Sequence, residues 1–356
     1  MILVDLFIIS KILFILIKKL MKLEVIKNRK NYLAVSAILF IISLLTIFFG
    51  NINLGIDMTW GTSSEYTYTK LDIEKVKTEI KEASNEVKLN WKKVINSTNA
   101  YKISGQNTLT LVIGFDSSIK DEELLKLKEN FRTKTLTILQ KNDATIKESS
   151  YTNIWKSFGD YIKNTAIITL IIAIIWITLY VAWTFSGVVS WISAYSFAAI
   201  VIVTLFHDVI ISSGFYLFST NLFPEFKIDT FFITALLTIL GYSINDTIVI
   251  FDRIRANLEE WARKKQSLRD IINKSIWETL RRSIFTSLTL FFVLVTIFFF
   301  WPEVIRWFIL VMIFGTIIWT YSSIFVASPL LYEMNKNKKL EIIKKKVYNP
   351  DDKIVV

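Results

Sequence analysis

The stretch Gly241-Tyr242-Ser243-Ile244-Asn245-Asp246-Thr247-Ile248-Val249-Ile250-Phe251 holds a carboxylate inside an apolar block that runs from Asp229 to Phe251. A block of this length predicts a membrane-spanning helix, because about 20 mostly apolar residues cross a bilayer. An acidic side chain at mid-membrane costs about 2.5 to 3.5 kcal/mol and usually faces a protein interior, where it marks a proton or ion path. Asp246 is therefore a candidate functional residue. The alternative is that it only ties helices together.

Five further apolar blocks extend this interpretation to the whole chain. Of its 356 residues, 53% are hydrophobic, which is too apolar for a soluble chain of this length. The sequence therefore predicts a polytopic α-helical membrane protein with six transmembrane helices, the first within 31–50 and the other five within 164–332. The blocks lie at 32–50, 165–183, 194–218, 229–251, 284–301 and 304–331.

Basic residues predict the orientation of these helices. The formal net charge is +11, and Lys and Arg gather before the first block, between the fourth and fifth, and after the last. Six crossings place these clusters on one side, so the positive-inside rule predicts cytoplasmic termini and a loop 51–163 outside the cytoplasm. The charge indicates topology rather than nucleic-acid binding, although ribosome or anionic-lipid contact is an alternative for the basic tail 333–356. The absence of Cys excludes thiolate metal sites, and no metal site is expected.

Two amphipathic segments accompany the spans. In residues 1–30, Lys11, Lys18 and Lys22 share one helical face against an apolar one, which favours an interfacial extension over a seventh span. Residues 252–282 predict a cytoplasmic amphipathic linker that lies along the membrane surface between the fourth and fifth spans.

The loop 51–163 has ordinary polarity and is predicted to fold as one extracytoplasmic domain. Its periodicities give the order β-α-β-β-α-β, that of a ferredoxin-like α+β unit with two helices on one face of an antiparallel sheet. Without a catalytic constellation, its expected role is contact with other proteins, and a cap on the helices is the alternative. The expected strands are 63–70, 86–95, 107–115 and 144–151, and the expected helices are 71–83 and 120–140.

Polar residues surround Asp246 on its own helix. At about 100° per residue, one small polar face carries Asp246 and three others, a pattern that suits close helix contact. The residues of this face and its flanks are Ala235, Tyr242, Ser243, Asn245 and Thr247.

His207 and Asp208 form a second polar site, in the third block. A His-Asp pair relays protons in some membrane proteins, and a pair that only packs helices together is an equal alternative. Since neighbouring residues on a helix point about 100° apart, the two side chains are not expected to form a compact dyad with each other.

Arg282 marks a third site, at the cytoplasmic mouth of the fifth span. It lies at helical spacing with Thr279 and Thr286, in a polar stripe that also includes Ser275 and Thr289. An arginine that stays protonated responds to the charge of a facing carboxylate, whereas an arginine at a helix end also commonly snorkels to the interface.

Four motifs in order resemble those of the SecF family of protein-export membrane proteins. Gly55-Ile56-Asp57-Met58-Thr59-Trp60-Gly61-Thr62 is similar to the family's Gly-Ile-Asp-Phe-Thr-Gly-Gly-Thr signature, matched at Gly55, Asp57, Thr59 and Gly61. The other three motifs are His207-Asp208-Val209, Gly241 to Val249 with Phe251 to Arg255, and Thr279 to Ser287. This chain departs from the signature at Met58 and Trp60.

The resemblance implies half of a resistance-nodulation-division (RND) type transporter in the cell membrane, completed by a SecD-like subunit. It implies proton passage at Asp246 and Arg282, coupled to movement of the external domain that assists late steps of protein translocation, and no enzymatic activity. Supporting polar residues are His207, Asp208, Tyr242, Ser243, Asn245, Thr247 and Thr286. No cofactor is expected beyond protons, or Na+ in their place. Expected partners are the SecD-like subunit, the Sec translocation channel, the translocating polypeptide and the lipid bilayer.

Two other functions fit a chain of this kind. One is half of an RND-type exporter of small molecules or lipids. The other is a non-conducting scaffold of the export machinery, in which Asp246 does not titrate.

Overall fold

The computed structural model describes residues 24–50, 55–59, 61–89, 91–102, 107–116, 119–153, 156–186, 192–222, 227–261, 266–300 and 305–337. The predicted extension up to residue 23, Trp60 and the tail from residue 338 lie outside these residues. Six helices of the described part are long and apolar enough to cross a membrane, which confirms a polytopic helical membrane protein. Their spans are Arg29–Phe49, Asp160–Thr184, Ala194–Thr220, Thr230–Leu258, Leu268–Phe300 and Arg306–Asn335.

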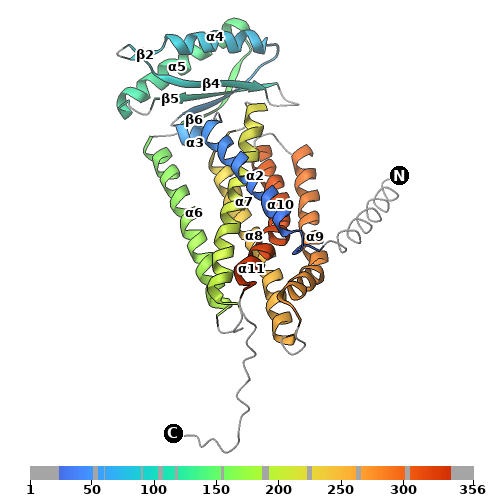
Figure 1. Ribbon diagram of the computed structural model, residues 1–356. Coiled ribbons are helices and arrows are strands. Elements are labelled where there is room, and N and C mark those ends of the chain that lie inside the picture. The colour runs from blue at the N-terminus through green and yellow to red at the C-terminus, as the bar shows by residue number, and fades with distance from the viewer. Residues whose placement is uncertain are drawn as a thin grey trace, which may run out of the picture.

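These spans form a helical bundle below a smaller α+β unit (Figure 1). The last span is one continuous helical run whose middle is a π-helix, η3, a wider turn that often occurs at functional sites. The bundle elements are α2 (Arg29–Phe49), α6 (Lys156–Thr184), α7 (Ala194–Leu222), α8 (Thr230–Trp261), α9 (Leu268–Phe300), α10 (Arg306–Ser322), η3 (Ser323–Ala327) and α11 (Ser328–Asn335).

The predicted amphipathic linker 252–282 is helical in its described residues and divides between two long helices. α8 continues to Trp261 and α9 already begins at Leu268, so both spans extend as one helical pair. Their apolar residues, among them Ile254, Leu258 and Ile271, are buried in the main core of the bundle. Asn257 donates to the Ser275 hydroxyl at 2.8 Å across the pair.

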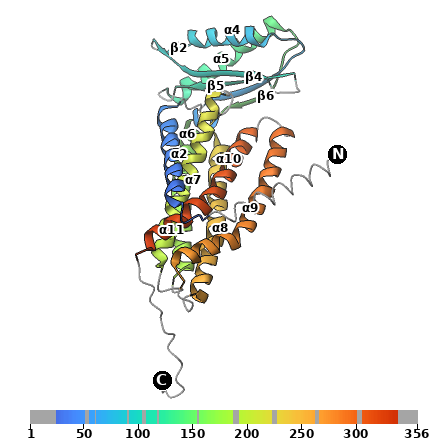
Figure 2. The ribbon, with the colours of Figure 1, turned by 45° about the vertical axis from the view of Figure 1, so that its right-hand side comes forward.

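The α+β unit contains a four-stranded sheet in the order β4-β5-β1-β6, with every neighbouring pair antiparallel. Helices α4 and α5 lie on the face of the sheet that points away from the bundle (Figure 2). Val76, Ile80, Leu111 and Phe131 are buried in the core of the unit. Its elements are α3 (Ile56–Thr59), β1 (Thr62–Thr67), α4 (Ile73–Glu86), β2 (Lys88–Leu89), β3 (Lys92–Lys93), β4 (Ile95–Lys102), β5 (Thr108–Phe115), α5 (Asp121–Asn142) and β6 (Lys147–Asn153).

The predicted second strand at 86–95 is wrong. Those residues form the end of α4, the short hairpin β2-β3 and the first residue of β4. The long second strand is β4, with the polar sequence Ile-Asn-Ser-Thr-Asn-Ala-Tyr-Lys. It lies at the edge of the sheet, where strands are often polar, so its sequence shows little of the alternation that marks a half-buried strand.

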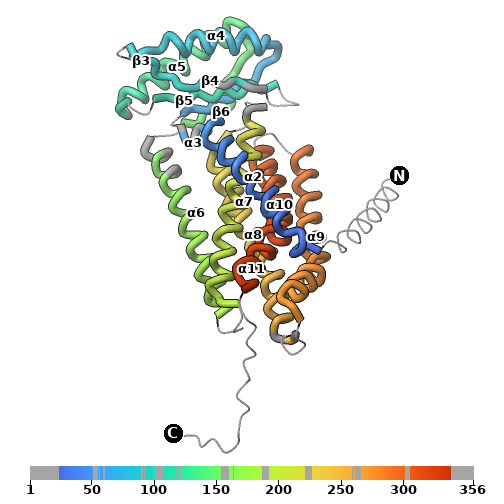
Figure 3. Tube along the Cα trace, viewed as in Figure 1, coloured from blue at the N-terminus to red at the C-terminus, as the bar shows by residue number. Residues whose placement is uncertain are grey.

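The chain passes twice between the bundle and the α+β unit, and the upper ends of α2 and α6 both face the unit (Figure 3). One passage runs from α2 through α3 into β1, and the other from β6 into α6. The short helix α3 therefore lies between the sheet and the bundle, close to where α8 begins.

Candidate functional site

Asp246 lies in the bundle core, where α8 packs against α9 and α10. Its side chain is 5% exposed. Among the described residues its one side-chain hydrogen bond comes from the Ser287 hydroxyl of α9, at a long 3.3 Å. Because an ionised carboxylate offers about four acceptor positions, this carboxyl group is poorly satisfied for so buried a site.

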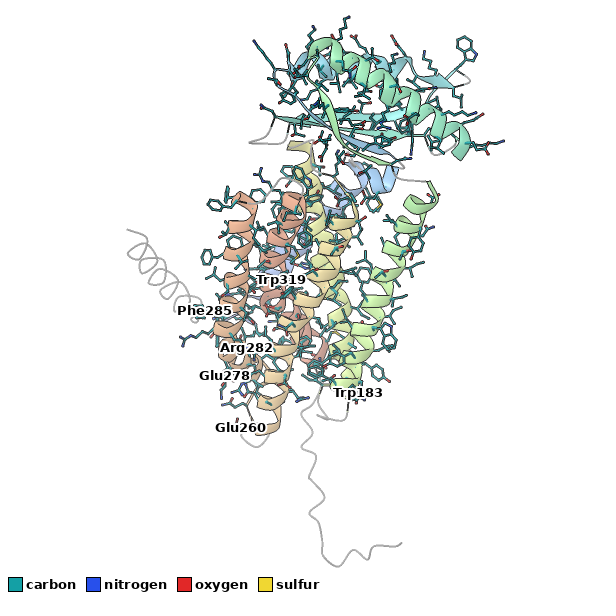
Figure 4. All side chains as sticks on the ribbon, turned by 180° about the vertical axis from the view of Figure 1, so that it is seen from behind. Trp183, Glu260, Glu278, Arg282, Phe285 and Trp319 are labelled. Atoms are coloured by element: carbon teal, nitrogen blue, oxygen red, sulfur yellow. The ribbon has the colours of Figure 1, made fainter. Side chains whose placement is uncertain are left out.

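The polar residues predicted around Asp246 divide between two sides of α8. Ser243 and Thr247 are buried with it, and the Thr247 hydroxyl donates to the Ser243 carbonyl at 3.0 Å. Asn245 and Tyr242 are exposed. Tyr242, predicted to share a helix face with Ser243 and Asp246, is therefore only partly covered in this chain. Its ring instead stacks on Trp319 of α10, which Figure 4 shows within the bundle, at 5.2 Å between ring centroids.

Asp208 is a second buried carboxylate, and it is fully hydrogen-bonded. The side chain is 0% exposed. Its Oδ2 atom accepts from the Ser243 hydroxyl of α8 at 2.6 Å and from the Ser322 hydroxyl of α10 at 2.7 Å. Its Oδ1 atom lies 2.8 Å from Nδ1 of His207. One carboxylate thus ties three helices together.

The prediction that His207 and Asp208 form no compact dyad is wrong. Neighbouring residues on a helix point about 100° apart, yet the ring and the carboxylate meet at 2.8 Å. With Asp208 as the acceptor, His207 donates through Nδ1–H, and in the neutral ring Nε2 accepts from the Ser36 hydroxyl of α2 at 2.5 Å. The network therefore extends to a fourth helix.

Arg282 does not contact Asp246 directly. Its side chain is exposed in the lower half of α9 (Figure 4), and it lies within electrostatic range of the Asp246 carboxylate. Thr286 is exposed as well, and its hydroxyl donates to the Arg282 carbonyl of its own helix at 2.9 Å. The predicted polar stripe is thus buried at Ser275 and Thr279 and exposed from Arg282 onward.

The signature turn docks on the start of α8. The amide of Gly55 donates to the Ile228 carbonyl at 2.7 Å. Asp57 accepts from the amide of Thr230 at 3.0 Å and from its hydroxyl at 2.5 Å. Gly61 is buried, and Thr59 ends α3.

An open cavity of 360 Å³ lies between α9 and the α10-η3 run. Its walls are mainly aromatic and aliphatic, with Trp277, Ile284 and Phe291 from α9. Ser287 also lines it, so the cavity reaches the residue that donates to Asp246.

Sequence reasoning gave no role to the three serines that complete these contacts, Ser36, Ser287 and Ser322. The available signals were a serine inside an apolar span, which is common and often bonds its own helix, and, for Ser287, its place at the end of the fourth motif. Their partners come from other helices, so spacing along one helix could not single them out.

The fold and these buried carboxyl groups define a polytopic helical membrane protein with a polar site inside its bundle and one α+β unit outside it. Within the described residues, no group of three or more His, Cys, Asp or Glu is arranged to hold a metal ion.

Comparison with known proteins identifies the family. The family model for the C-terminal part of the protein export membrane proteins SecD and SecF matches residues 134–337. The protein translocase subunit SecF of Calditerrivibrio nitroreducens is 34% identical, over 89% of this chain and 98% of the relative. That of Endomicrobium trichonymphae is 31% identical, over 90% and 94%. The chain belongs to the SecF family.

Solved structures agree with this assignment. SecDF from a Thermus species, a translocon-associated membrane protein, matches with a TM-score of 0.67 and 25% identity. SecDF in a super-membrane-facing form matches with a TM-score of 0.56 and 24% identity. Each match covers 87% of this chain but only 38% of the SecDF chain, so this chain spans well under half of those proteins.

Proposed function

We propose that this chain is the SecF subunit of a SecDF complex and assists late steps of protein translocation across the cell membrane, driven by the proton gradient. The observation that carries the proposal is the contrast between the two buried carboxylates. Asp208 accepts from three donors, so neutralising it would cost those interactions. Asp246 accepts from one distant hydroxyl and loses little when it takes up a proton. Asp246 is therefore the proton-exchanging group, with Arg282 as the fixed positive charge near it.

The energy available is sufficient for such a role. One elementary charge that crosses about 100 mV releases about 2.3 kcal/mol, which biases a two-state equilibrium by more than tenfold. Na+ in place of protons would provide the same energy per charge.

A SecD-like subunit supplies the second half of an RND-type transporter. Its contact is a stripe along α8 that carries Thr234, Gly241 and Asn245, all exposed in this chain within a membrane-spanning helix. A Cβ added at Gly241 would meet nothing within 4 Å, so another helix backbone has room to approach closely there. Polar groups that face lipid are costly, so this stripe requires a covering helix.

The remaining expectations belong to the same proposal. The basic segments place both termini in the cytoplasm, and the α+β unit, with the strand order of a ferredoxin-like domain, lies on the opposite side. There it meets the translocating polypeptide as that chain leaves the Sec translocation channel. The complex needs no cofactor other than the transported ion.

The deciding experiment is Asp246→Asn in vesicles that contain this chain, its SecD-like partner and the channel. We expect export to lose its dependence on the proton gradient, because the amide exchanges no proton. Asp252→Asn, which changes an exposed carboxylate at the end of the same span, is the matched control and should behave like the wild type. Gradient-dependent export that persists in Asp246→Asn contradicts the proton role and favours the scaffold. Replacing the proton gradient with a Na+ gradient identifies the ion.

A further inference from the structure

The α+β unit is fastened to the same helix that carries Asp246. Three contacts make this attachment, which we call the α3-α8 joint: Gly55 N–H to the Ile228 carbonyl at 2.7 Å, and the Thr230 amide and hydroxyl to Asp57 at 3.0 and 2.5 Å. All three lie at the first turn of α8 or just before it. The joint therefore fixes the covalent connection that leads from α2 through α3 into β1 onto the start of α8.

The chain approaches the start of α8 very closely at Gly55. A Cβ on Gly55 would lie 2.8 Å from the Cβ of Asp229 and 3.2 Å from the Ile228 carbonyl oxygen, so only glycine allows α3 to approach α8 this closely. Met58 of α3 is 4% exposed, so α3 packs closely against its surroundings.

The helix behind the joint is well suited to carry a displacement. α8 is continuous from Thr230 to Trp261, and about 24 Å of helix separates Thr230 from Asp246 at about 1.5 Å per residue. A continuous helix packed on its neighbours moves as a stiff body. A shift or rotation at Asp246 therefore reaches Thr230 with little loss.

The start of α8 is itself fixed. Asp229 accepts from the amide of Phe232 at 2.9 Å and caps the helix. The Tyr216 hydroxyl of α7 donates to the Lys227 carbonyl at 2.6 Å and holds the preceding residues. The joint is thus made to a helix end that is itself held by hydrogen bonds. Within the joint, the Asp57 side chain accepts both hydrogen bonds from Thr230.

We propose that Asp57, Gly55 and Thr230 are positioning residues that transmit displacement of α8 to the α+β unit. This inference rests on the proposed function only for what displaces α8, namely the charge state of Asp246. The joint predicts that the unit follows α8 and that weakening the joint separates the two without altering Asp246 itself.

The test measures the position of the unit directly. Because the sequence contains no Cys, spin labels at Leu125→Cys on α5 and Phe292→Cys on α9, both at exposed positions, report one distance in the full chain reconstituted with its partner. Asp246→Asn imitates the neutral state. We expect this substitution to shift the distance distribution when the joint is intact and to leave it unshifted in Asp57→Ala.

Three further variants separate transmission from damage to the fold. Thr230→Val removes the hydroxyl donor but keeps the amide, so it should reduce the shift, and Asp57→Asn keeps an acceptor oxygen and should restore most of it. Thr234→Val is the matched control, since that hydroxyl bonds only its own helix, at 2.9 Å to the Thr230 carbonyl, and it should leave the shift unchanged. Export driven by the gradient should fall about fivefold or more in Asp57→Ala.

The outcomes distinguish this inference from the proposed function. An Asp246→Asn shift of equal size with and without the joint, or no shift even in the intact protein, overturns the transmission role. The carboxyl infrared band of Asp246 reports its titration separately, and it should respond to pH identically in wild type and in Thr230→Val. Loss of that response in the wild type would count against the proton role while leaving the mechanical result intact.

Discussion

Removing the Asp208 carboxylate should destabilise the bundle more than any other single polar substitution in the spans. Asp208→Ala removes the acceptor of the Ser243 hydroxyl from α8 and leaves the Ser322 hydroxyl of α10 only the Trp319 carbonyl of its own helix, at 3.3 Å, in a fully buried site. It also releases Nδ1 of His207, whose other nitrogen contacts Ser36 of α2.

The magnitude follows from the donors that are left behind. A buried donor without a partner costs about 1 to 3 kcal/mol, and interhelical hydrogen bonds in membranes measure about 0.6 kcal/mol on average and up to about 1.7. Two interhelical bonds and one oriented imidazole therefore give a loss of about 3 kcal/mol. Asp208→Asn keeps one acceptor oxygen and should lose roughly half as much.

Equilibrium unfolding in mild detergent titrated with a denaturing detergent measures this loss. Ser212→Ala is the matched control, because Ser212 is equally buried in the same helix and its hydroxyl has no hydrogen-bond partner among the described residues. The control should change stability by less than about 0.5 kcal/mol. A loss in Asp208→Ala no larger than in Ser212→Ala would refute the reasoning that this network holds the helices together.

Two further predictions concern the ends and the open face of α8. Burial, with the Asp57 carboxylate adding to it, raises the pKa of Asp229 from 3.8 to about 6, so ionising this group costs stability as pH rises through that window. Asp229→Asn, whose side chain can still cap α8, should unfold at the same temperature as the wild type at pH 4. Its stability relative to the wild type should then increase as the pH rises to 6. The other groups near Asp229 are Lys227, whose pKa burial lowers to about 8, and Tyr216. Gly241→Leu should leave the isolated chain folded, since its side chain meets open space, yet reduce co-purification of the SecD-like partner at least tenfold. Ile168→Phe, on the exposed apolar face of α6, should not reduce it.

Much of the bundle could be predicted from the sequence because its signal is local. Each of the six spans is a block of about 20 apolar residues, and the cost of Asp246 follows from its position inside one block. The order of strands and helices in the α+β unit was also legible, except at β4. That edge strand consists mostly of polar residues, so its sequence shows neither a clear alternation of apolar and polar side chains nor a recognisable first residue.

The helix pair around Asn257 and Ser275 shows what periodicity leaves open. An amphipathic sequence fits a surface helix and a helix packed on its neighbour equally well, because periodicity states which side is apolar and not what covers it. Spacing placed Tyr242 on the face of Asp246 but did not indicate that its ring stacks on Trp319 and stays half-exposed.

The sequence by itself determined the membrane class, the six spans and the presence of two acidic residues that needed an explanation. Only the tertiary structure showed which of the two carboxylates has a full set of hydrogen bonds. Asp208 is saturated by serines from α8 and α10, whereas Asp246 has one distant hydroxyl from α9. These partners lie 35, 114 and 41 positions away along the chain, so no local pattern contains them. Hydrophobicity adds up along a segment, but hydrogen bonding depends on which distant segments meet.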